Sequence, residues 1–593
     1  MKLSLTTVVL ILLLVLRALF ALPLDGSLPG GTDTTSHLFR SFQVMSGVNN
    51  WSYDWYGGFW FSSYPPLFSF LVAAFGGVLG LVLSYKVLAD LLFVFLPLAF
   101  YVLLKEFKLP EKYALLSVAI FSLMPFSSYY LYDGRLPSLL ALFIGLFFWK
   151  FQLRYARNGS TADFLLAVAL LAASISAHHL TAALLFLVAF AWVFAEKGKS
   201  VVRPFAVVTV AALALSAFWI APFLIETSDS RAGTGLIAAP VSAGIISDII
   251  SSSYASDFFS SAFSPLFLVA LEAFTVLVFV FALFRLTKNE HLKNTVIVVI
   301  ALGLLSLAMS FKRALIVAPI PLSLMVALAV SEAGKLKKFL AVVALLVFFL
   351  GFIALNPVSL RSPELPAAVD RVIYLPVGSS VGGAPYDMVL PALAGNEDII
   401  GWYPQAESPA KTRYALMLID VFGSSPEKYF SLLRAGNVNT IIINATQSEL
   451  IWRFSSSGLY DQKEQYGFVV FAPKEKFSYI EVSGNYTPAE VSKLSDRITA
   501  VFNCKPDRVT VKESFDYRWH ATLNGKDLTL APDEYGFSTF ESDASGECVL
   551  DMRFSDPPYA VFFRAVSLVA LAVLAVFSAR HIMTMPRPER ARK

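Results

Sequence analysis

Residues 3–40 read LSLTTVVLILLLVLRALFALPLDGSLPGGTDTTSHLFR, an apolar run followed directly by a polar, glycine-containing loop. The run, 3–22, follows Lys2 and is long enough to cross about 30 Å of hydrocarbon as a helix. It is longer than the apolar core of a usual signal peptide, and no convincing small-residue cleavage site follows it. The stretch therefore predicts an uncleaved first transmembrane helix, with a polar loop at the membrane surface after it.

Apolar runs of this kind recur along the rest of the chain. Of the 593 residues, 56% are hydrophobic and 15% are charged, and the mean hydropathy is +0.64, which excludes an ordinary soluble multidomain protein. Thirteen runs are long enough, or nearly so, to cross a bilayer: 3–22, 66–84, 87–104, 113–131, 136–153, 162–177, 180–196, 204–224, 264–285, 294–310, 314–331, 338–356 and 559–579. We therefore predict a polytopic α-helical membrane protein with about 12–13 transmembrane segments.

The basic residues between these runs predict how the helices are oriented, because short cytoplasmic loops carry an excess of Lys and Arg. Six basic clusters agree with one topology: 105–112, 150–157, 197–203, 285–293, 335–338 and 580–593. A full crossing by 66–84 would move the first cluster to the opposite side. The Gly76-Gly77 pair and the Tyr64-Pro65-Pro66 entry favour a short or re-entrant segment there. We predict twelve full crossings and one segment whose depth the sequence leaves open.

This topology divides the chain into a membrane domain, an outer domain and a final helix. The polar outer domain begins with mixed helical and strand patterns, and continues with alternating strands and an Asn524-Gly525 hairpin turn. The predicted units are a membrane domain at 1–356 with its first outer loop at 25–63, an extracytoplasmic domain at 357–558 (α/β at 357–480, β-sandwich at 481–558), and a last transmembrane helix with a basic cytoplasmic tail at 559–593.

The chain has only two cysteines, Cys504 and Cys548, and both belong to the predicted outer domain. Extracytoplasmic compartments permit oxidation, so we expect a disulfide between them. Two unpaired thiols are the alternative.

The first outer loop presents the most informative polar residues. Asp33, His37 and Arg40 recur at helical spacing, so one helix face can present a carboxylate, an imidazole and a guanidinium together. This arrangement predicts a polar site at the membrane surface. The alternative is that Asp33 only caps a short amphipathic helix that begins at Thr34.

Two further polar groups fall on the same predicted face. Asp133 and Arg135 flank a glycine in a short outer turn, where they are either part of the site or a local ion pair at a helix start. His178 and His179 interrupt an apolar stretch at the outer boundary, and ionisable residues there indicate function. The alternative for the histidines is a helix-end residue bonded to a carbonyl.

Taken together, these motifs resemble the GT-C type of integral-membrane glycosyltransferase. The resemblance lies in a glycine-flanked Asp followed by His and Arg, a Trp/Tyr-rich Gly-Gly segment, and a Tyr-Pro-Pro-Leu entry to the next helix. More narrowly, the chain is similar to the archaeal and bacterial membrane family labelled "6-pyruvoyl-tetrahydropterin synthase-related". The likeness continues through Asp133-Gly134-Arg135, Ala177-His178-His179-Leu180-Thr181-Ala182 and residues 215–226, LSAFWIAPFLIE. It covers the first 230 residues well and the remaining helices only as a pattern.

This resemblance implies transfer of a sugar from a polyprenyl-phosphate donor to a lipid, glycan or protein acceptor at the outer face of the cell membrane. Asp33 matches the acidic residue that engages the acceptor and acts as general base, and Asp133 is the second catalytic candidate. The implied substrate-binding residues are His37, Arg40, Asp54, Arg135, His178, His179, Glu226, Lys312 and Arg313. Some relatives hold a divalent cation, Mg²⁺ or Mn²⁺, between two such carboxylates, although the first loop here has no paired Asp-x-Asp.

Other functions make different demands on the sequence. A lipid or polysaccharide flippase predicts polar residues near the bilayer centre and detectable repeats, neither of which stands out. A non-catalytic scaffold whose outer domain binds glycans remains an alternative. No P-loop, CxxC, HExxH or GxSxG element occurs where a soluble enzyme would need it, and the net charge of +4 gives no indication of nucleic-acid binding.

Overall fold

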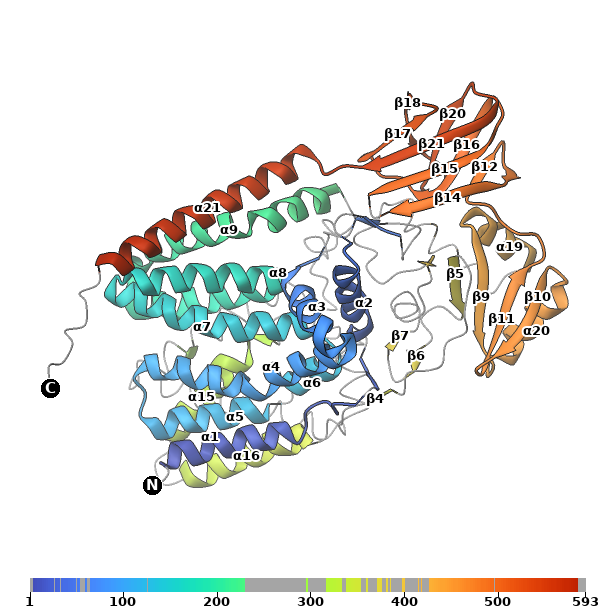
Figure 1. The fold of residues 1–593 in the computed structure, drawn as a ribbon. Coiled ribbons are helices and arrows are strands. Elements are labelled where there is room, and N and C mark those ends of the chain that lie inside the picture. Colours follow the sequence, from blue (N-terminus) through green and yellow to red (C-terminus); the bar gives the residue numbers. More distant parts are fainter. Residues whose placement is uncertain are drawn as a thin grey trace, which may run out of the picture.

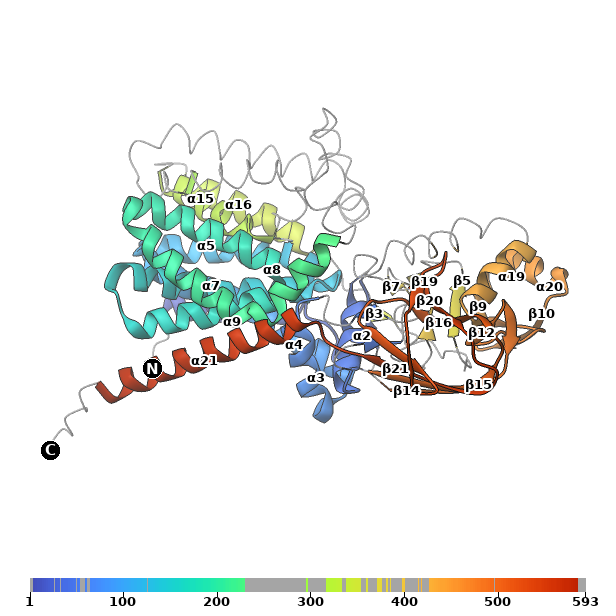
Figure 2. The same cartoon turned by 90° about the horizontal axis from the view of Figure 1, so that it is seen from above.

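The fold is an apolar helical bundle with β-rich modules beyond one of its ends (Figure 1). The computed structural model describes residues 4–229 with short gaps at 26, 32, 49–50, 54–58, 61–63 and 125. It also describes 295–296, 316–353 except 333–336, parts of 359–425, and 426–584 except 495. Seen from above, the last helix lies beside α9 at the edge of the bundle, where the Ser567 hydroxyl of that helix donates to the Ala214 carbonyl at 3.0 Å (Figure 2).

Helices of the bundle account for most of the described membrane domain. Their bounds are α1 Leu5–Ala18, α3 Leu67–Leu79, α4 Leu81–Leu104, α5 Glu111–Leu123, α6 Phe126–Tyr132, α7 Leu136–Asn158, α8 Thr161–Lys197, α9 Val202–Asp229, α15 Pro319–Glu332, α16 Lys337–Ile353 and α21 Pro558–Thr584. Five helical stretches among the described residues are long and apolar enough to cross a membrane. The chain is a multi-pass membrane protein. The predicted runs 264–285 and 294–310 lie almost wholly outside the described residues, so the number of crossings stays a prediction.

The α8 segment is two helices joined at a sharp turn. The backbone leaves the helical conformation at His178, with φ −163° and ψ 99°. A Cβ at Gly145 of α7 would lie 3.4 Å from the Ser174 hydroxyl and 2.2 Å from a Leu185 methyl group, so both residues pack on the same neighbour. A straight helix would separate them by about 16 Å. The chain therefore reverses at His178, as the separate runs 162–177 and 180–196 predict.

Two helix boundaries differ from the sequence prediction. The helix of 66–84 continues through Gly76-Gly77 and ends at Gly80, whose φ of 82° only glycine adopts at low cost. The short α3 is followed at once by α4, which begins at Leu81 rather than at residue 87. The run 113–131 is divided between α5 and α6 instead of forming one helix. Hydropathy gives the length of an apolar segment but not the point where its backbone turns.

Arg17 is a charged residue inside α1 that the sequence analysis did not single out. Its side chain is buried, and its Nε donates to the Phe93 carbonyl of α4 at 2.7 Å. Pro97, four residues later, has no N–H, which leaves that carbonyl without its helical partner. Other Arg17 nitrogens donate to the Ser122 carbonyl at 2.8 Å and the Ser127 hydroxyl at 3.0 Å. One guanidinium thus joins α1 to α4, α5 and α6.

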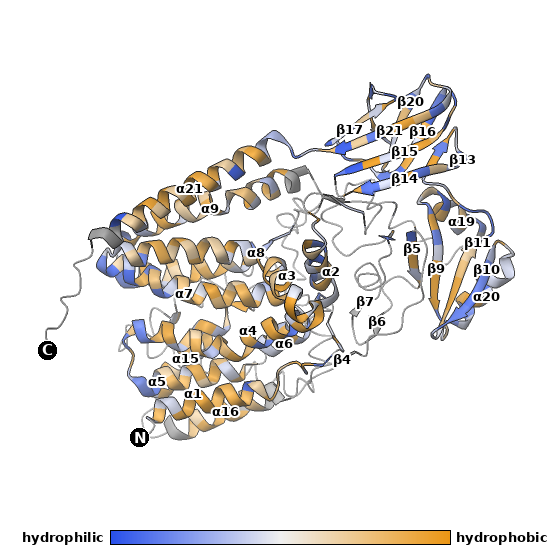
Figure 3. Ribbon diagram, viewed as in Figure 1, coloured by the Kyte–Doolittle hydropathy of each residue, from blue (hydrophilic) through white to orange (hydrophobic). Residues whose placement is uncertain are grey.

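The two ends of the bundle differ in charge. Arg157 of α7 donates to the Glu106 carbonyl at 2.6 Å and pairs with Glu196 at 2.9 Å. These contacts bring the basic clusters 105–112, 150–157 and 197–203 to one end. Hydrophilic residues gather there, at the end away from the β-modules (Figure 3). The described basic clusters and the β-modules therefore occupy opposite ends of the bundle.

The first module beyond the bundle is α/β. Its sheet has the order β10-β11-β9-β5-β8, in which β5 pairs in parallel with β9 and β8, and β9, β11 and β10 run antiparallel. The strands are β5 Arg371–Leu375, β8 Glu397–Asp398, β9 Val438–Asn444, β10 Tyr460–Gln465 and β11 Phe468–Pro473, and the helices are α19 Pro426–Ala435 and α20 Ser448–Ser457. Ile373, Ile441 and Phe471 are fully buried in its core.

The second module beyond the bundle consists of two five-stranded antiparallel sheets that share one core. One sheet has the order β13-β12-β16-β20-β19, with bounds Asn485–Thr487, Ile480–Val482, Asp507–Ser514, Phe537–Ser542 and Ala531–Pro532. The other has the order β14-β15-β21-β17-β18, with bounds Ala489–Leu494, Arg497–Cys504, Gly546–Phe554, Trp519–Leu523 and Lys526–Leu528. Val509 of one sheet and Leu550 of the other are both fully buried in this core. The predicted helical bundle, β-rich domain and final apolar helix are confirmed.

A disulfide joins Cys504 of β15 to Cys548 of β21. These strands are hydrogen-bonded neighbours, and both cysteines are buried in the core of the sandwich. Trp519 is also buried in this core. The disulfide therefore links two strands that already pair.

Candidate functional site

The first outer loop folds into helix α2, Thr34–Met45, with Asp33 at its N-cap. The Asp33 carbonyl accepts from the His37 N–H at 3.1 Å, which begins the helix. Its carboxylate makes no capping hydrogen bond, while its N–H donates to the Asp133 carbonyl at 3.0 Å. Asp33 thus starts the helix through its backbone and not through its side chain.

Arg135 brings together Asp33, before α2, and Asp133, after α6. Its Nε lies 2.5 Å from Asp133 Oδ2 and 3.7 Å from Asp33 Oδ2. Burial lowers the pKa of Arg135, but the carboxylates of Asp133 and Asp33 and the neighbouring Tyr129 outweigh it, so the pKa rises above its ordinary value. The rings of Tyr129 and Tyr130 lie 5.4 and 5.8 Å from the guanidinium. The cluster is one fixed cation shared by two carboxylates.

Two glycines allow the loops to approach backbone to backbone. A Cβ at Gly31 would lie 2.3 Å from the Tyr132 carbonyl, and a Cβ at Gly134 would lie 2.3 Å from the Thr34 nitrogen. Both glycines have positive φ, 113° and 83°, which L side chains rarely adopt. A larger residue at either position would separate Asp33 from Arg135.

Tyr85 and Lys86 of α4 fix this junction, and the sequence analysis did not identify them. The Tyr85 hydroxyl lies 3.3 Å from Thr34 Oγ1 and 3.4 Å from the Gly134 carbonyl. Lys86 Nζ contacts the Pro23 carbonyl at 2.8 Å and Asp25 Oδ1 at 2.7 Å, which holds the start of the first loop. The sequence feature that indicates them is a lysine beside a tyrosine within an apolar stretch, because a charged side chain there is costly unless it is paired.

His37 and Arg40 face α3 and the segment before it. Both side chains are buried, and the His37 ring lies 5.5 Å from Tyr64 and 5.9 Å from Phe68. The Arg40 guanidinium lies 5.1 Å from the Tyr64 ring. Burial lowers the pKa of His37 to about 3, so the imidazole is neutral at physiological pH. His37 and Arg40 thus contact aromatic rings before and within α3, whereas the Asp33 carboxylate lies near Arg135.

The histidine pair lies at the α8 turn. His178 Nδ1 is 2.8 Å from the Thr181 hydroxyl and accepts from the Thr181 N–H at 3.2 Å, which caps the second helix of α8. The His179 ring packs against Trp219 at 5.6 Å and Phe223 at 4.9 Å, both on α9. The α8 segment contacts α3. The histidine pair thus lies at the turn within α8 and packs against α9. The carboxylates of Asp33 and Asp133 lie elsewhere, where the start of α2 meets the turn after α6.

The side chains of the remaining predicted site residues fall outside the part of the chain that the structure describes. Asp54, Lys312 and Arg313 lie outside the described residues, as does the side chain of Glu226, whose backbone belongs to α9.

A divalent ion does not fit between the two carboxylates in this arrangement. Among the described residues, no group of three or more His, Cys, Asp or Glu side chains is placed to hold a metal ion. The Arg135 guanidinium already lies beside both Asp33 and Asp133, and a second cation there would be repelled.

Comparisons with known proteins bear on the fold. The sequence matches no protein-family model and no curated protein at significant similarity, and the narrower family resemblance is not confirmed. Arabinofuranosyltransferase AftD from mycobacteria aligns over 94% of this chain and 57% of its own, with a TM-score of 0.57 and 10% identity. This chain therefore spans just over half the length of AftD.

The oligosaccharyltransferase of Archaeoglobus fulgidus, solved with Zn and sulfate, covers 79% of this chain and 73% of its own, with a TM-score of 0.52 and 14% identity. The same enzyme, AglB, solved with an inhibitory peptide and a dolichol-phosphate, gives a TM-score of 0.50, 14% identity and coverages of 79% and 74%. At these identities the likeness concerns the fold. The chain has the fold of the integral-membrane glycosyltransferases of the GT-C type.

Proposed function

We propose that the protein is a membrane glycosyltransferase that transfers a sugar from a polyprenyl-phosphate-linked donor to an acceptor on the extracytoplasmic face. The observation that carries this proposal is the shared position of Asp33 and Asp133 around Arg135 in a chain with a GT-C fold. The dolichol-phosphate and inhibitory peptide bound to AglB support a lipid-linked donor and an acceptor for this fold. The class of acceptor, whether lipid, glycan or protein, is open.

In the proposed reaction an acceptor oxygen or nitrogen attacks the anomeric carbon of the donor sugar. Asp33 takes the proton of the nucleophile, the bond from the anomeric carbon to the phosphate oxygen breaks, and its electron pair leaves with the polyprenyl phosphate. Asp33 suits the role of base because 30% of its side chain is exposed, against 12% for Asp133. Arg135 faces the departing phosphate, where a guanidinium stabilises negative charge.

Asp133 is then a positioning residue. It holds the guanidinium of Arg135 at 2.5 Å and keeps it from pairing fully with Asp33, which lies 3.7 Å away. A carboxylate that is tightly paired with a cation is a weaker base. The unequal distances therefore leave Asp33 able to accept a proton.

Arg135 takes the place between the carboxylates that a Mg²⁺ or Mn²⁺ ion would need. We expect transfer to persist in EDTA with the purified protein. Loss of activity in EDTA and recovery with either ion would contradict this role of Arg135 and would favour a metal bound between Asp33 and Asp133.

A complementation experiment tests the function. A strain that lacks the gene is complemented with wild type, Asp33→Asn, or the matched control Asp461→Asn, which changes an exposed Asp on β10. Mass spectrometry of surface glycans and lipid-linked sugars should show loss of one glycan and accumulation of one lipid-linked sugar in the first variant only. Equal glycan profiles in all three strains, at equal protein levels, would refute the catalytic assignment.

A further inference from the structure

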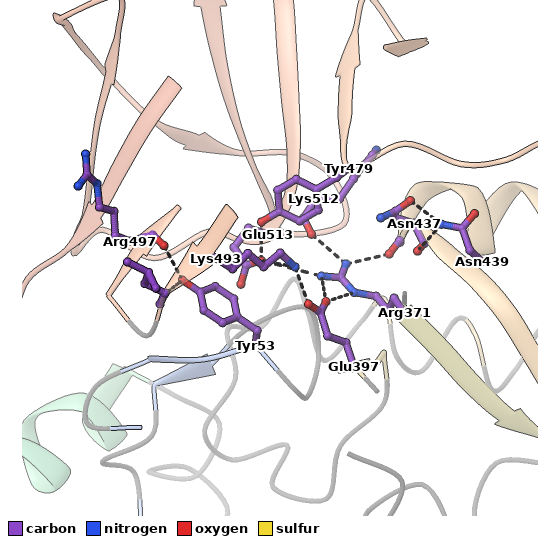
Figure 4. Close-up of polar contacts among 12 residues, drawn as sticks. Tyr53, Arg371, Glu397, Asn437, Asn439, Tyr479, Lys493, Arg497, Lys512 and Glu513 are labelled. Carbon is purple, nitrogen blue, oxygen red and sulfur yellow. Dashed lines mark hydrogen bonds and ion pairs between the residues drawn. The ribbon is translucent and has the colours of Figure 1, made fainter. Parts of the chain in front are cut away.

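A polar pocket lies where the α/β module meets the β-sandwich, remote in sequence from Asp33. Its volume is about 460 Å³, which is within the range of about 300–1,000 Å³ typical of small-molecule sites. Strands of both modules line it. Its lining includes Tyr486 and, labelled in Figure 4, Arg371, Glu397, Asn437, Tyr479 and Lys493. The pocket is thus built jointly by two folded units.

Three charged residues at this pocket, Arg371, Lys493 and Glu397, pair with one another, and Lys476 also belongs to the lining. Arg371 donates to Glu397 at 3.1 Å and to the Gly436 and Lys512 carbonyls at 2.8 Å. Lys493 donates to Glu397 at 2.6 Å, and both cations lie 3.9 Å from the buried Glu513 (Figure 4). Two positive charges therefore face two negative charges within a short distance.

The pairing of Arg371 and Lys493 with Glu397 indicates the class of ligand. An anion would have to compete with Glu397 for Arg371 and Lys493, and a cation would have to compete with them for Glu397. Separating buried, hydrogen-bonded ion pairs is costly. A neutral ligand rich in hydroxyl groups can instead add hydrogen bonds to the pairs as they stand, because hydroxyl groups both donate and accept.

The walls of the pocket suit the same ligand. The Asn439 amide donates to Asn437 Oδ1 at 3.0 Å and accepts from the Phe477 N–H at 2.9 Å, which fixes a pair of amides at the pocket. Tyr486 on β13 is 45% exposed and offers an aromatic face with a hydroxyl at its tip. Fixed amides beside an exposed aromatic ring match the mixed polar and apolar surface of a sugar ring.

Tyr53 joins this pocket to the loop that carries Asp33. Its ring lies 5.3 Å from the Lys493 ammonium, and its hydroxyl donates to the Leu494 carbonyl and lies 3.4 Å from the Arg497 carbonyl (Figure 4). A ligand held by the pocket is therefore linked through one residue to the first outer loop.

We propose that this pocket binds neutral sugar residues of a glycan acceptor, a substrate class that deepens the proposed glycosyl transfer and rests on it. The pocket would hold sugars remote from the reacting hydroxyl, and it would select neutral over acidic glycans.

The test uses the full-length protein in nanodiscs and two probes, the neutral and the acidic oligosaccharide fractions released from the surface of the source cells. Saturation-transfer NMR compares wild type with Tyr486→Ala and with Asn437→Gly. Glycine suits position 437 because Asn437 has a φ of 55°. Trp452→Ala is the matched control, since Trp452 is 69% exposed on α20 and does not line the pocket.

The neutral fraction should bind wild type and Trp452→Ala alike, and about tenfold more weakly to each pocket variant, as expected for the loss of one stacking or amide contact. No binding of the neutral fraction, binding of the acidic fraction alone, or equal binding by all four proteins would overturn the pocket assignment. The Asp33→Asn complementation result is independent of these outcomes. A failure here with transfer intact would therefore refute only the pocket.

Discussion

Arg135 is held closely by Asp133 and loosely by Asp33, and this asymmetry separates the roles of two chemically identical side chains. The sequence places both carboxylates on one face through the positions of basic clusters, but it gives no distances. The positive-φ glycines 31 and 134 allow the contact, because any Cβ there would meet the backbone of the other loop. The distances between these side chains thus depend on how closely the two loop backbones approach each other. Patterns of hydropathy and charge do not give that distance.

Asp133→Asn should separate the positioning role from the catalytic one. With its nearer partner neutralised, Arg135 pairs more fully with Asp33, which becomes a weaker base. We expect kcat to fall about tenfold, with little change in the KM for the donor, and the acidic limb of the pH–rate profile to move to lower pH. Steady-state kinetics over a pH range check this. An unchanged profile would argue against the positioning role.

His37 should make the protein sensitive to acid. Its folded pKa of about 3 lies below the ordinary value of 6.5, so the unfolded state binds a proton more readily and stability is lost as pH falls from 6.5 toward 3. The loss at pH 5 should be roughly 2 kcal/mol. The drop in Tm between pH 7 and pH 5 should therefore be smaller in His37→Phe than in wild type. Equal drops would show that His37 is not buried as a neutral group.

The helices show how far patterns of apolar residues predict the elements. Four predicted runs match helices of the structure: 136–153, 162–177, 180–196 and 204–224. The break predicted between the second and third of these runs is the turn at His178. The same patterns misplaced the end of α3, because Gly76-Gly77 remains helical and Gly80 does not. Alternation and the Asn524-Gly525 turn predicted the β-sandwich, where Asn524 and Gly525 both have positive φ. The periodicity of apolar residues and the turn residues thus predict the helices and strands, whereas the positions where an apolar helix is interrupted depend on tertiary contacts.

Arg17 is the clearest case of such a contact. Replacing it with Met would leave the Phe93 and Ser122 carbonyls and the Ser127 hydroxyl without this donor inside the bundle. We expect a loss of roughly 2–4 kcal/mol, since an unsatisfied buried polar group costs about 1–3 kcal/mol. Thermal unfolding in detergent measures the effect. Lys526→Met on β18, at the exposed ion pair with Asp543, should change Tm little, and an equal effect of both substitutions would contradict the bridging role.

At the scale of the whole molecule, the outer modules and the Asp33 loop lie at one end of the bundle and the described basic clusters at the other (Figures 1 and 3). The contacts between these parts were beyond sequence reasoning. Tyr53 reaches Leu494 and Arg497, and the short strands β1 Leu28–Pro29 and β4 Ser359–Leu360 pair across more than half of the chain. Such contacts depend on pairs of residues far apart in the sequence, which the local periodicity of apolar residues does not indicate.

Cysteine labelling in intact cells tests this division. No described cysteine is free, because Cys504 and Cys548 are joined, so the wild type gives no background signal. A membrane-impermeant maleimide should label Lys463→Cys, an exposed position on β10, but should label Lys199→Cys only after the cells are opened. Labelling of Lys199→Cys in intact cells would reverse the proposed orientation.

The most direct measurement is the release of free polyprenyl phosphate by the purified protein, reconstituted with lipid-linked sugars and glycans from its source cells. Mass spectrometry should detect release with wild type and with Asp461→Asn, and a rate at least about a hundredfold lower with Asp33→Asn, as loss of a general base predicts. Release by Asp33→Asn at the wild-type rate would show that Asp33 is not the base.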